Sequence, residues 1–270
     1  MIDYTAFITE VLQEVSGIAV QNFGKVTSAT TKTHDNNQVL TETDIEIGNY
    51  IVSAIKKSFP NHNIIDEEAG VINNSSQYTW VVDPIDGTSN FASGIPTYCI
   101  MIGLLNGGIP IAGGVAIPSF HEICIAEKGK GAFCNGKKLH VTTEENLLRC
   151  LVSYGIDGHQ EDPKFTRDEC ALLADIILGI RNLRTNNSNY DSMLVAKGSL
   201  GAWLNRTTRI WDNVAPQIIV EEAGGLYTDF FGKPKDYTYP ISKAENNFTV
   251  CAAAPTIHGK LQEIIHKNTS

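Results

Sequence analysis

The sequence predicts a mixed fold in which an α+β first half precedes an α/β second half. Three patterns support this prediction. Apolar residues recur at helical spacing near the N-terminus, short apolar segments separated by turn residues span 97–139, and strands alternate with helices after residue 150. The first two patterns are typical of helices packed on an antiparallel sheet, and the third is typical of a layered α/β unit.

The first half is expected to begin with two amphipathic helices, over 3–23 and 44–59. Gly24 closes the first helix and Pro60 ends the second. A short strand is expected around 37–41, another at 64–65 and a longer one at 78–83. A meander of antiparallel strands follows, with turn signals at 106–108, 118–119 and 135–136.

The second half is expected to alternate between strands and helices. The strands cover 150–155, 201–205, 226–230 and 248–254, and the helices cover 168–180, 189–197, 212–224 and 256–268. The sequence contains no internal repeat and no obvious linker. We therefore expect two halves, residues 1–146 and 147–270, that pack as one compact unit.

The composition bounds the partners that the chain can have. Its 270 residues are 42% hydrophobic and 19% charged, an ordinary mixture for a globular protein with a substantial core. The formal net charge of -9 argues against nucleic acid as a partner, because binding to a phosphate backbone needs a basic surface. An acidic protein can still bind an anionic substrate if cations are concentrated at the site. The negative net charge is therefore a first indication of a metal site.

Two features indicate a reduced, cytoplasmic setting without membrane contact. The apolar N-terminal segment carries Asp3, Glu10 and Glu14, a pattern unlike a secretory signal or a membrane span. The six cysteines contain no C-x-x-C pair and no zinc-like grouping. We therefore expect free thiols and a cytoplasmic location.

Acidic residues gather at the ends of apolar segments and at helix starts, namely at Asp44, Glu67-Glu68, Asp83 with Asp86, and Asp212. A helix cap is the ordinary explanation for Asp44 or Asp212 alone, and surface charge is the ordinary explanation for the glutamates. The stretch DPIDGT at 83–88 is harder to explain in this way. Its proline predicts a rigid, tight turn, and two carboxylates on such a turn raise each other's pKa unless a cation lies between them.

The ligand types in this acidic set predict the metal and the chemistry. Carboxylate oxygens without His or Cys favour Mg²⁺, with Mn²⁺ as the alternative, over zinc. Residues 89–91 can begin a helix, so the amides of Gly87 and Thr88 would lie at its N-terminus and bind an anion. Cations beside an anion site make a phosphate site, so these residues predict metal-assisted transfer of a phosphoryl group to water.

The same residues resemble the signatures of a known family. WVVDPIDGTSNF at 80–91 resembles the D-P-[ILV]-D-G-T-x-x-F signature of the inositol monophosphatase family of Mg²⁺-dependent, lithium-sensitive phosphomonoesterases. WDNVAPQIIVEEAGG at 211–225 is similar to the second signature, W-D-x-x-A followed by E-A-G-G. IIDEEAG at 64–70 and TETD at 41–44 lie where the family has its E-E and T-x-x-D elements. The order and spacing agree over nearly the whole chain.

The resemblance implies a layered αβαβα sandwich, a homodimer, and an active site between the two halves. It also implies two to three Mg²⁺ ions. The first would be held by Glu67, Asp83 and the carbonyl of Ile85, and the second by Asp83, Asp86 and Asp212, with a third ion near Glu67.

The resemblance also implies how water and phosphate are held. A water oriented by Glu67 and Thr88 would attack phosphorus in line, while Asp44 accepts a hydrogen bond from the Thr88 hydroxyl. The amides of Gly87 and Thr88 would bind the phosphate oxygens.

The residues expected around the leaving group depart from the family pattern. Asn205 stands where the inositol-1-phosphate enzymes have a Glu, Arg209 where they have a His, and Gln38 where they have an Asp. Residues 186–189 (NNSN) replace a small G-[ST]-A-A stretch. These departures are either neutral changes at a solvated rim or an adaptation to another leaving group. They make Asn186, Asn205 and Arg209 the candidate substrate contacts.

The expected function is hydrolysis of a small phosphate monoester, with inositol 1-phosphate as the first candidate. Histidinol phosphate, fructose 1,6-bisphosphate and 3'-phosphoadenosine 5'-phosphate are alternative substrates. A non-catalytic protein that binds a phosphorylated metabolite in the same pocket is the alternative of a different class. The pair Thr88 and Asp44 favours the enzyme, because binding alone would not require it.

Overall fold

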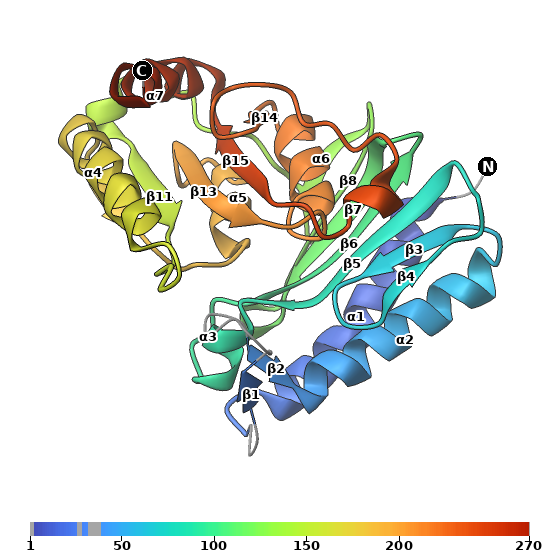
Figure 1. Ribbon diagram of the computed structural model, residues 1–270. Helices are drawn as coiled ribbons and strands as arrows, with labels where there is room; N and C mark the ends of the chain where they lie inside the picture. Colours follow the sequence, from blue (N-terminus) through green and yellow to red (C-terminus); the bar gives the residue numbers. More distant parts are fainter. Residues whose placement is uncertain (1–2, 26–28, 32–38, 270) are drawn as a thin grey trace.

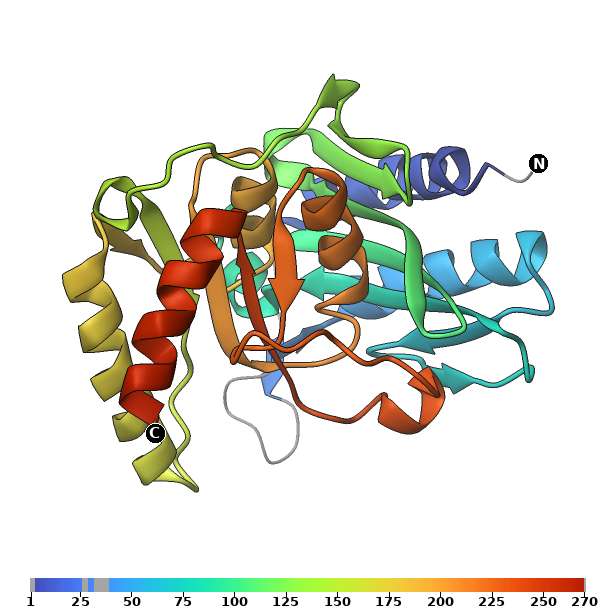
Figure 2. The same cartoon turned by 90° about the horizontal axis from the view of Figure 1, so that it is seen from above.

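A computed structural model describes residues 3–25, 29–31 and 39–269, which form two large sheets, a short β-ribbon and seven α-helices (Figures 1 and 2). The ribbon pairs β1 (Ala29–Thr31) with β2 (Val39–Thr41). Gln38 and the first residues of the strand predicted at 37–41 lie outside the described part of the chain.

The larger sheet contains eight strands from the first half of the chain. All neighbouring strands are antiparallel except β3 and β5, which are parallel. In spatial order they are β10 (Lys137–Lys138), β9 (Gly131–Cys134), β8 (Glu122–Glu127), β7 (Ile109–Ile117), β6 (Cys99–Asn106), β5 (Tyr78–Asp86), β3 (Asn63–Asp66) and β4 (Gly70–Ile72).

The smaller sheet contains five strands from the second half. Strand β11 is parallel to both of its neighbours, whereas β15 is antiparallel to both of its own. The order is β12 (Asn182–Arg184), β11 (Leu151–Gly155), β13 (Ala202–Thr208), β15 (Phe248–Ala253) and β14 (Leu226–Thr228).

The helices form three layers around the two sheets (Figure 1). Helices α1 (Tyr4–Asn22) and α2 (Glu42–Ser58) cover the outer face of the larger sheet. Helices α5 (Tyr190–Ala196) and α6 (Val214–Glu222) lie between the sheets, and α4 (Pro163–Gly179) and α7 (Pro255–Thr269) cover the outer face of the smaller sheet. The predicted αβαβα sandwich is confirmed, and α6 packs on both sheets, so the predicted division at residue 146 stays a prediction.

Each sheet is apolar on both faces because successive side chains along a strand point to opposite sides. On β6, Ile100 and Ile102 pack under α1 and α2, whereas Met101 between them packs in the central layer. On β13, Trp203 faces the central layer and Leu204 faces α4 and α7. Each sheet therefore contributes to two cores.

Two adjacent glycines on β7 allow helices to approach the sheet from opposite sides. A Cβ atom at Gly113 would lie 2.7 Å from the side chain of Ile218 on α6. A Cβ atom at Gly114 would lie 2.4 Å from the side chain of Ile8 on α1. Larger residues at either position would force the layers apart.

Several predicted boundaries are wrong for local reasons. Helix α4 begins at Pro163 rather than 168, because the Asp162 side chain accepts the Phe165 N–H and a proline fits the first helical position. The strand predicted at 226–230 ends at Thr228, because the Asp229 side chain accepts amides of the following turn. The three-residue strands β4 and β12 are largely exposed and lack the alternation that would have predicted them.

The six cysteines are all free, as predicted. No helix within the described ranges is long and apolar enough to cross a lipid bilayer.

Candidate active site

Asp83 and Asp86 reach the same face of the larger sheet because β5 is irregular between them. In a regular strand, residues three apart point to opposite faces. Asp83 pairs with Met101 on β6 and Asp86 pairs with Cys99. Over this length β5 advances by three residues and β6 by two, so β5 contains one extra residue. Met101 and Cys99 both face the central layer, and the two carboxylates do so as well. The tight turn predicted for 83–88 is limited to Gly87, because β5 continues to Asp86, with Pro84 at the irregularity.

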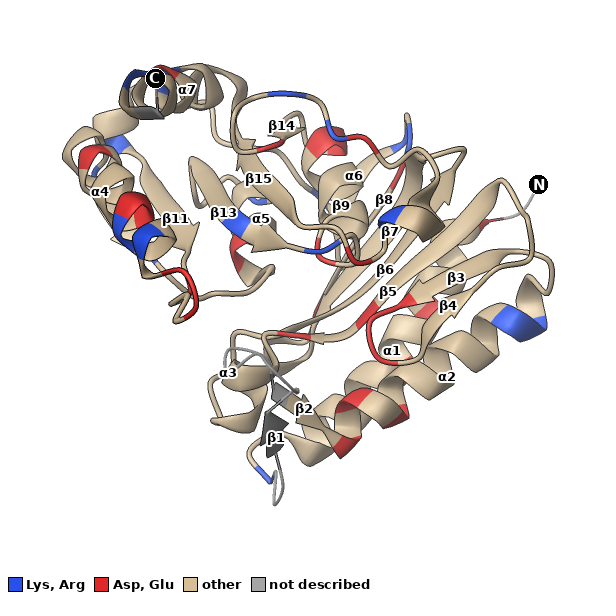
Figure 3. Ribbon diagram, viewed as in Figure 1, with Lys and Arg blue, Asp and Glu red and all other residues tan. Residues whose placement is uncertain are grey.

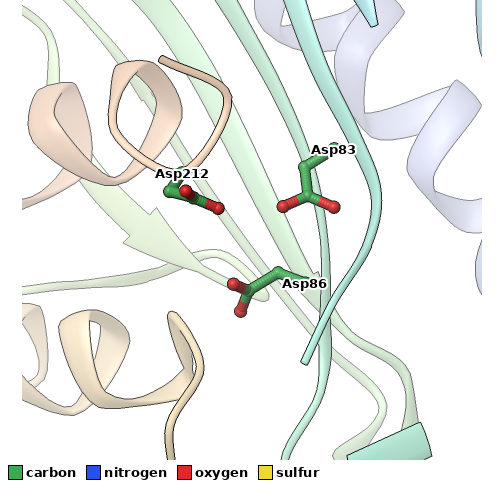
Figure 4. Close-up of side chains that lie close together, drawn as sticks. All are labelled: Asp83, Asp86 and Asp212. Carbon is green, nitrogen blue, oxygen red and sulfur yellow. The ribbon is translucent and has the colours of Figure 1, made fainter. Parts of the chain in front are cut away.

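Asp212 brings a third carboxylate from the second half of the chain. One oxygen from each of Asp83, Asp86 and Asp212 lies within 4.8 Å of the others (Figure 4). The Arg209 backbone N–H donates to Asp212 Oδ2 at 2.5 Å and orients it toward the other two. Helix α6 begins two residues later than predicted, at Val214, so Asp212 lies in the turn before the helix.

This carboxylate cluster is unfavourable when it is fully charged. Asp83 is only 1% exposed. Burial, followed by the charge of Asp212, raises the pKa of Asp86 well above its ordinary value. Burial, followed by the charge of Glu67, raises the pKa of Asp212 from 3.8 to about 7. The cluster fits a hard divalent cation, because every donor is a carboxylate oxygen and the cation would offset the repulsion.

Thr88 and Asp44 also lie together. Thr88 Oγ1 is 3.2 Å from Asp44 Oδ1 and 2.8 Å from the Ile85 carbonyl oxygen. The other Asp44 oxygen accepts the Thr41 backbone N–H at 2.9 Å, in the capping box that begins α2. Burial, as the largest influence, raises the pKa of Asp44 to about 6. Asp44 is thus both a helix-capping residue and a hydrogen-bond partner of Thr88.

Gly87 allows the chain to turn sharply from β5 into the short helix α3 (Thr88–Ala92). Its φ angle of 79° lies in the left-handed region that favours glycine. A Cβ atom at this position would lie 3.0 Å from the Ser188 Cβ, so a side chain would also crowd the opposite wall. Gly87 and Thr88 both line the cavity over the carboxylate cluster.

This cavity has a volume of about 480 Å³ and is lined from both halves of the chain. Seven acidic side chains from the described ranges line it, against a single arginine, Arg209; the acids are Glu67, Asp83, Asp86, Asp157, Glu161, Asp162 and Asp212. Figure 3 shows this acidic character on β5 and on the loop before α4. An anionic substrate would be repelled here unless cations bind beside it.

Two of the three predicted substrate contacts line the cavity. Asn205 is 9% exposed, and its side-chain oxygen accepts the Thr207 N–H at 2.8 Å. Arg209 is half-buried, and its guanidinium donates to the Glu245 carbonyl at 2.5 Å. Both side chains are therefore partly oriented by the protein.

The prediction that Asn186 contacts the substrate stays a prediction, and its observed contacts are with the protein. Its side-chain amide donates to the buried Asp191 carboxylate at 2.6 Å, and its backbone carbonyl accepts the Asn90 amide at 2.7 Å. Asn186 is not among the residues that line the cavity, whereas its neighbours 187–189 are.

Sequence reasoning missed Asn189, which contacts two members of the cluster. Its backbone N–H donates to Asp86 Oδ2 at 2.5 Å, and its side-chain amide donates to the Asp212 carbonyl oxygen at 3.0 Å. The loop at 157–162, which forms the far rim of the cavity, was also missed. The one sequence feature that could have indicated a role for Asn189 is that it is polar in a stretch where small residues were expected.

Comparisons with known proteins identify the family of the chain. The sequence profile of the inositol monophosphatase family matches residues 3–269. A fructose-1,6-bisphosphatase/inositol-1-monophosphatase of Thermotoga maritima is 34% identical over 231 residues, which are 86% of each chain. An inositol monophosphatase of Mesembryanthemum crystallinum is 33% identical over 214 residues, covering 77% of this chain and 79% of that one.

A solved structure shows the same arrangement of layers. The structure of an IMPase from Thermotoga maritima superposes with a TM-score of 0.86 at 28% identity, covering 99% of this chain and 98% of that one. The match extends through both sheets and the central layer that carries the carboxylate cluster. The chain belongs to the inositol monophosphatase family, whose members are metal-dependent phosphatases of phosphate monoesters.

Proposed function

We propose that this protein hydrolyses inositol 1-phosphate to inositol and phosphate with Mg²⁺ as its cofactor. The observation that carries the proposal is the cluster of Asp83, Asp86 and Asp212, with oxygens within 4.8 Å, in the wall of a cavity of about 480 Å³. The family membership supports phosphomonoester chemistry. The proposal includes a homodimer and a cytoplasmic location, which light scattering and fractionation test.

Two Mg²⁺ ions would be held by the acidic wall of the cavity. Glu67, Asp83 and the Ile85 carbonyl would hold one ion, and Asp83, Asp86 and Asp212 would hold the other, with a third ion near Glu67 and Mn²⁺ as a substitute. The Ile85 carbonyl already accepts the Thr88 hydroxyl, but its oxygen has a second lone pair. Bound ions of this kind lower the pKa of water and offset charge on the oxygens of the reacting phosphoryl group.

Thr88 would orient the attacking water. Its hydroxyl has one proton and two acceptors in reach, the Ile85 carbonyl at 2.8 Å and Asp44 at 3.2 Å. When that proton is donated, the Thr88 oxygen can only accept from a water, so the water is turned with its oxygen lone pair free. Glu67, which lines the same cavity, would accept the other hydrogen of that water. The amides of Gly87 and Thr88 would bind the phosphate oxygens.

The far rim favours an uncharged polyol as leaving group. It carries the carboxylates of Asp157, Glu161 and Asp162, which would repel a second phosphate. Hydroxyl groups can instead pair with these carboxylates and with the amide of Asn205. Inositol has this chemistry.

Fructose 1,6-bisphosphate is the second candidate. Arg209 supplies one cation at the cavity wall, and the Thermotoga maritima relative is named for both activities. One arginine against three rim carboxylates makes it the weaker substrate.

A substrate panel at fixed, saturating Mg²⁺ tests the proposal. The panel contains inositol 1-phosphate, fructose 1,6-bisphosphate, 3'-phosphoadenosine 5'-phosphate and histidinol phosphate, compared by kcat/KM. The highest value is expected for inositol 1-phosphate. A higher value for another member would reassign the leaving group. Mg²⁺-dependent binding of these compounds without any turnover would show a binding protein instead.

A further inference from the structure

The three carboxylates of the cluster come from segments far apart in the sequence, and something must fix their spacing. Asp83 and Asp86 share β5, so the larger sheet sets their separation. Asp212 lies before α6 in the second half of the chain. Asn189 bonds to Asp86 and to the backbone of Asp212, and so connects the two segments.

Asn189 makes these contacts from a rigid position. It is the residue before α5 and is 1% exposed. Its backbone N–H donates to Asp86 Oδ2 at 2.5 Å, and Nδ2 lies 3.5 Å from Asp86 Oδ1. The same Nδ2 donates to the Asp212 carbonyl oxygen at 3.0 Å. One amide group thus spans both segments.

Acceptors on one side of the Asn189 amide determine which way it points, and Ser192 lies on the other side. The Ser192 hydroxyl lies 2.9 Å from Asn189 Oδ1 and 2.7 Å from the Asn189 carbonyl oxygen. If the amide were flipped, its oxygen would face the Asp212 carbonyl and the Asp86 carboxylate, which are both acceptors. These two acceptors therefore allow only one orientation, in which the amide oxygen lies beside the Ser192 hydroxyl. Ser192 is itself fully buried.

A neutral donor suits this position. A lysine or arginine would also bond to Asp86, but its positive charge would compete with a divalent cation for the cluster. An amide holds the carboxylate through an N–H group and leaves its negative charge available. Side chains that orient metal-binding carboxylates in this way commonly affect metal affinity by about 10–100-fold.

We propose that Asn189, whose amide oxygen lies beside the Ser192 hydroxyl, is a positioning residue that sets the spacing between Asp86 and the Asp212 segment and thereby the affinity of the cluster for divalent cations. The inference rests on the proposed metal-dependent function and adds to it a residue that lies at none of the proposed ligand positions. It also gives a role to the asparagine that replaces a small residue in the NNSN stretch.

Calorimetric titration of the whole protein with Mn²⁺, without substrate, tests this inference. Asn189→Ala should weaken Mn²⁺ binding about 10–100-fold, because the side-chain contacts are lost while the backbone N–H remains. Asn247→Ala is the matched control: Asn247 also lines the cavity, but its amide donates to the Arg206 carbonyl, so Mn²⁺ affinity should not change.

Ser192→Ala tests the same positioning by Asn189 without removing the Asn189 amide. It should weaken Mn²⁺ binding about 2–10-fold, the usual effect of one hydrogen bond, and it keeps the test decisive if Asn189→Ala does not fold. Mn²⁺ affinities within twofold of wild type in the folded variants would overturn the inference, even if their Tm in EDTA were lower. A wild-type protein that binds no Mn²⁺ would overturn the proposed function together with this inference.

Discussion

Replacing Asp212 by Asn should stabilise the metal-free protein at high pH. Burial raises the pKa of Asp212 from 3.8 to about 7, so the folded state holds the proton more tightly than the unfolded chain. The stability from this group is complete below pH 3.8 and is lost as the pH rises through 7. Asparagine removes the charge and can still accept the Arg209 N–H through Oδ1.

The magnitude follows from the size of the shift. About three pKa units correspond to on the order of 4 kcal/mol at pH 8. Asp212 is half-buried, so solvent screens part of this cost, and the asparagine amide must itself be desolvated. We therefore expect Asp212→Asn to raise the free energy of unfolding by about 1–3 kcal/mol at pH 8, and by much less at pH 5.

Urea denaturation in EDTA, followed by circular dichroism at pH 8 and pH 5, provides the measurement. Asp175→Asn is the control, because Asp175 is an exposed carboxylate on α4 and its replacement should change little. With Mg²⁺ present the order should reverse, since the wild type gains binding energy that the variant lacks. A variant less stable than the wild type in EDTA at pH 8 would refute the reasoning about the cluster.

Three further predictions concern the residues around Thr88. Thr88→Ala should lower kcat about 100-fold with little change in KM, whereas Thr88→Ser should keep most of the rate. Steady-state kinetics of the two variants test this, and equal rates would contradict the role of the hydroxyl. The rate should fall as the pH drops through about 6, because protonated Asp44 is a much weaker acceptor and leaves only the Ile85 carbonyl to hold the Thr88 proton; a pH–rate profile that is flat from 8 to 5 would exclude this. Gly87→Ala should lower stability by about 1–2 kcal/mol in thermal denaturation, because alanine is strained at a φ of 79° and meets Ser188; an unchanged Tm would contradict this.

Much of the fold was predictable because its signals are local. Apolar periodicity placed α1 and α2, and turn residues separated the strands of the meander. The sequence at 41–44 fits the capping box that begins α2, since both the Thr41 and Asp44 side chains act within one turn. Short exposed strands such as β12 have no such pattern, because they are formed by pairing with a neighbour.

The candidate site was predictable in its residue types but not in its contacts. The irregularity that brings Asp83 and Asp86 to one face depends on the register with β6, which sequence does not show. The bond between the Asn186 amide and Asp191 could not be anticipated either. The contact between Asn189 and Asp86 spans more than a hundred residues, so local patterns carry no trace of it.

The most direct test of the carboxylate cluster is the rate of inositol 1-phosphate hydrolysis by Asp83→Asn, measured at saturating Mg²⁺ beside the wild type. Asp83 is 1% exposed and is shared between both proposed ions, so the substitution keeps the shape of the site and removes its central charge. We expect kcat/KM to fall by about 1,000-fold or more, with circular dichroism showing an intact fold. Hydrolysis at the wild-type rate by the folded variant would contradict metal-dependent catalysis at this cluster.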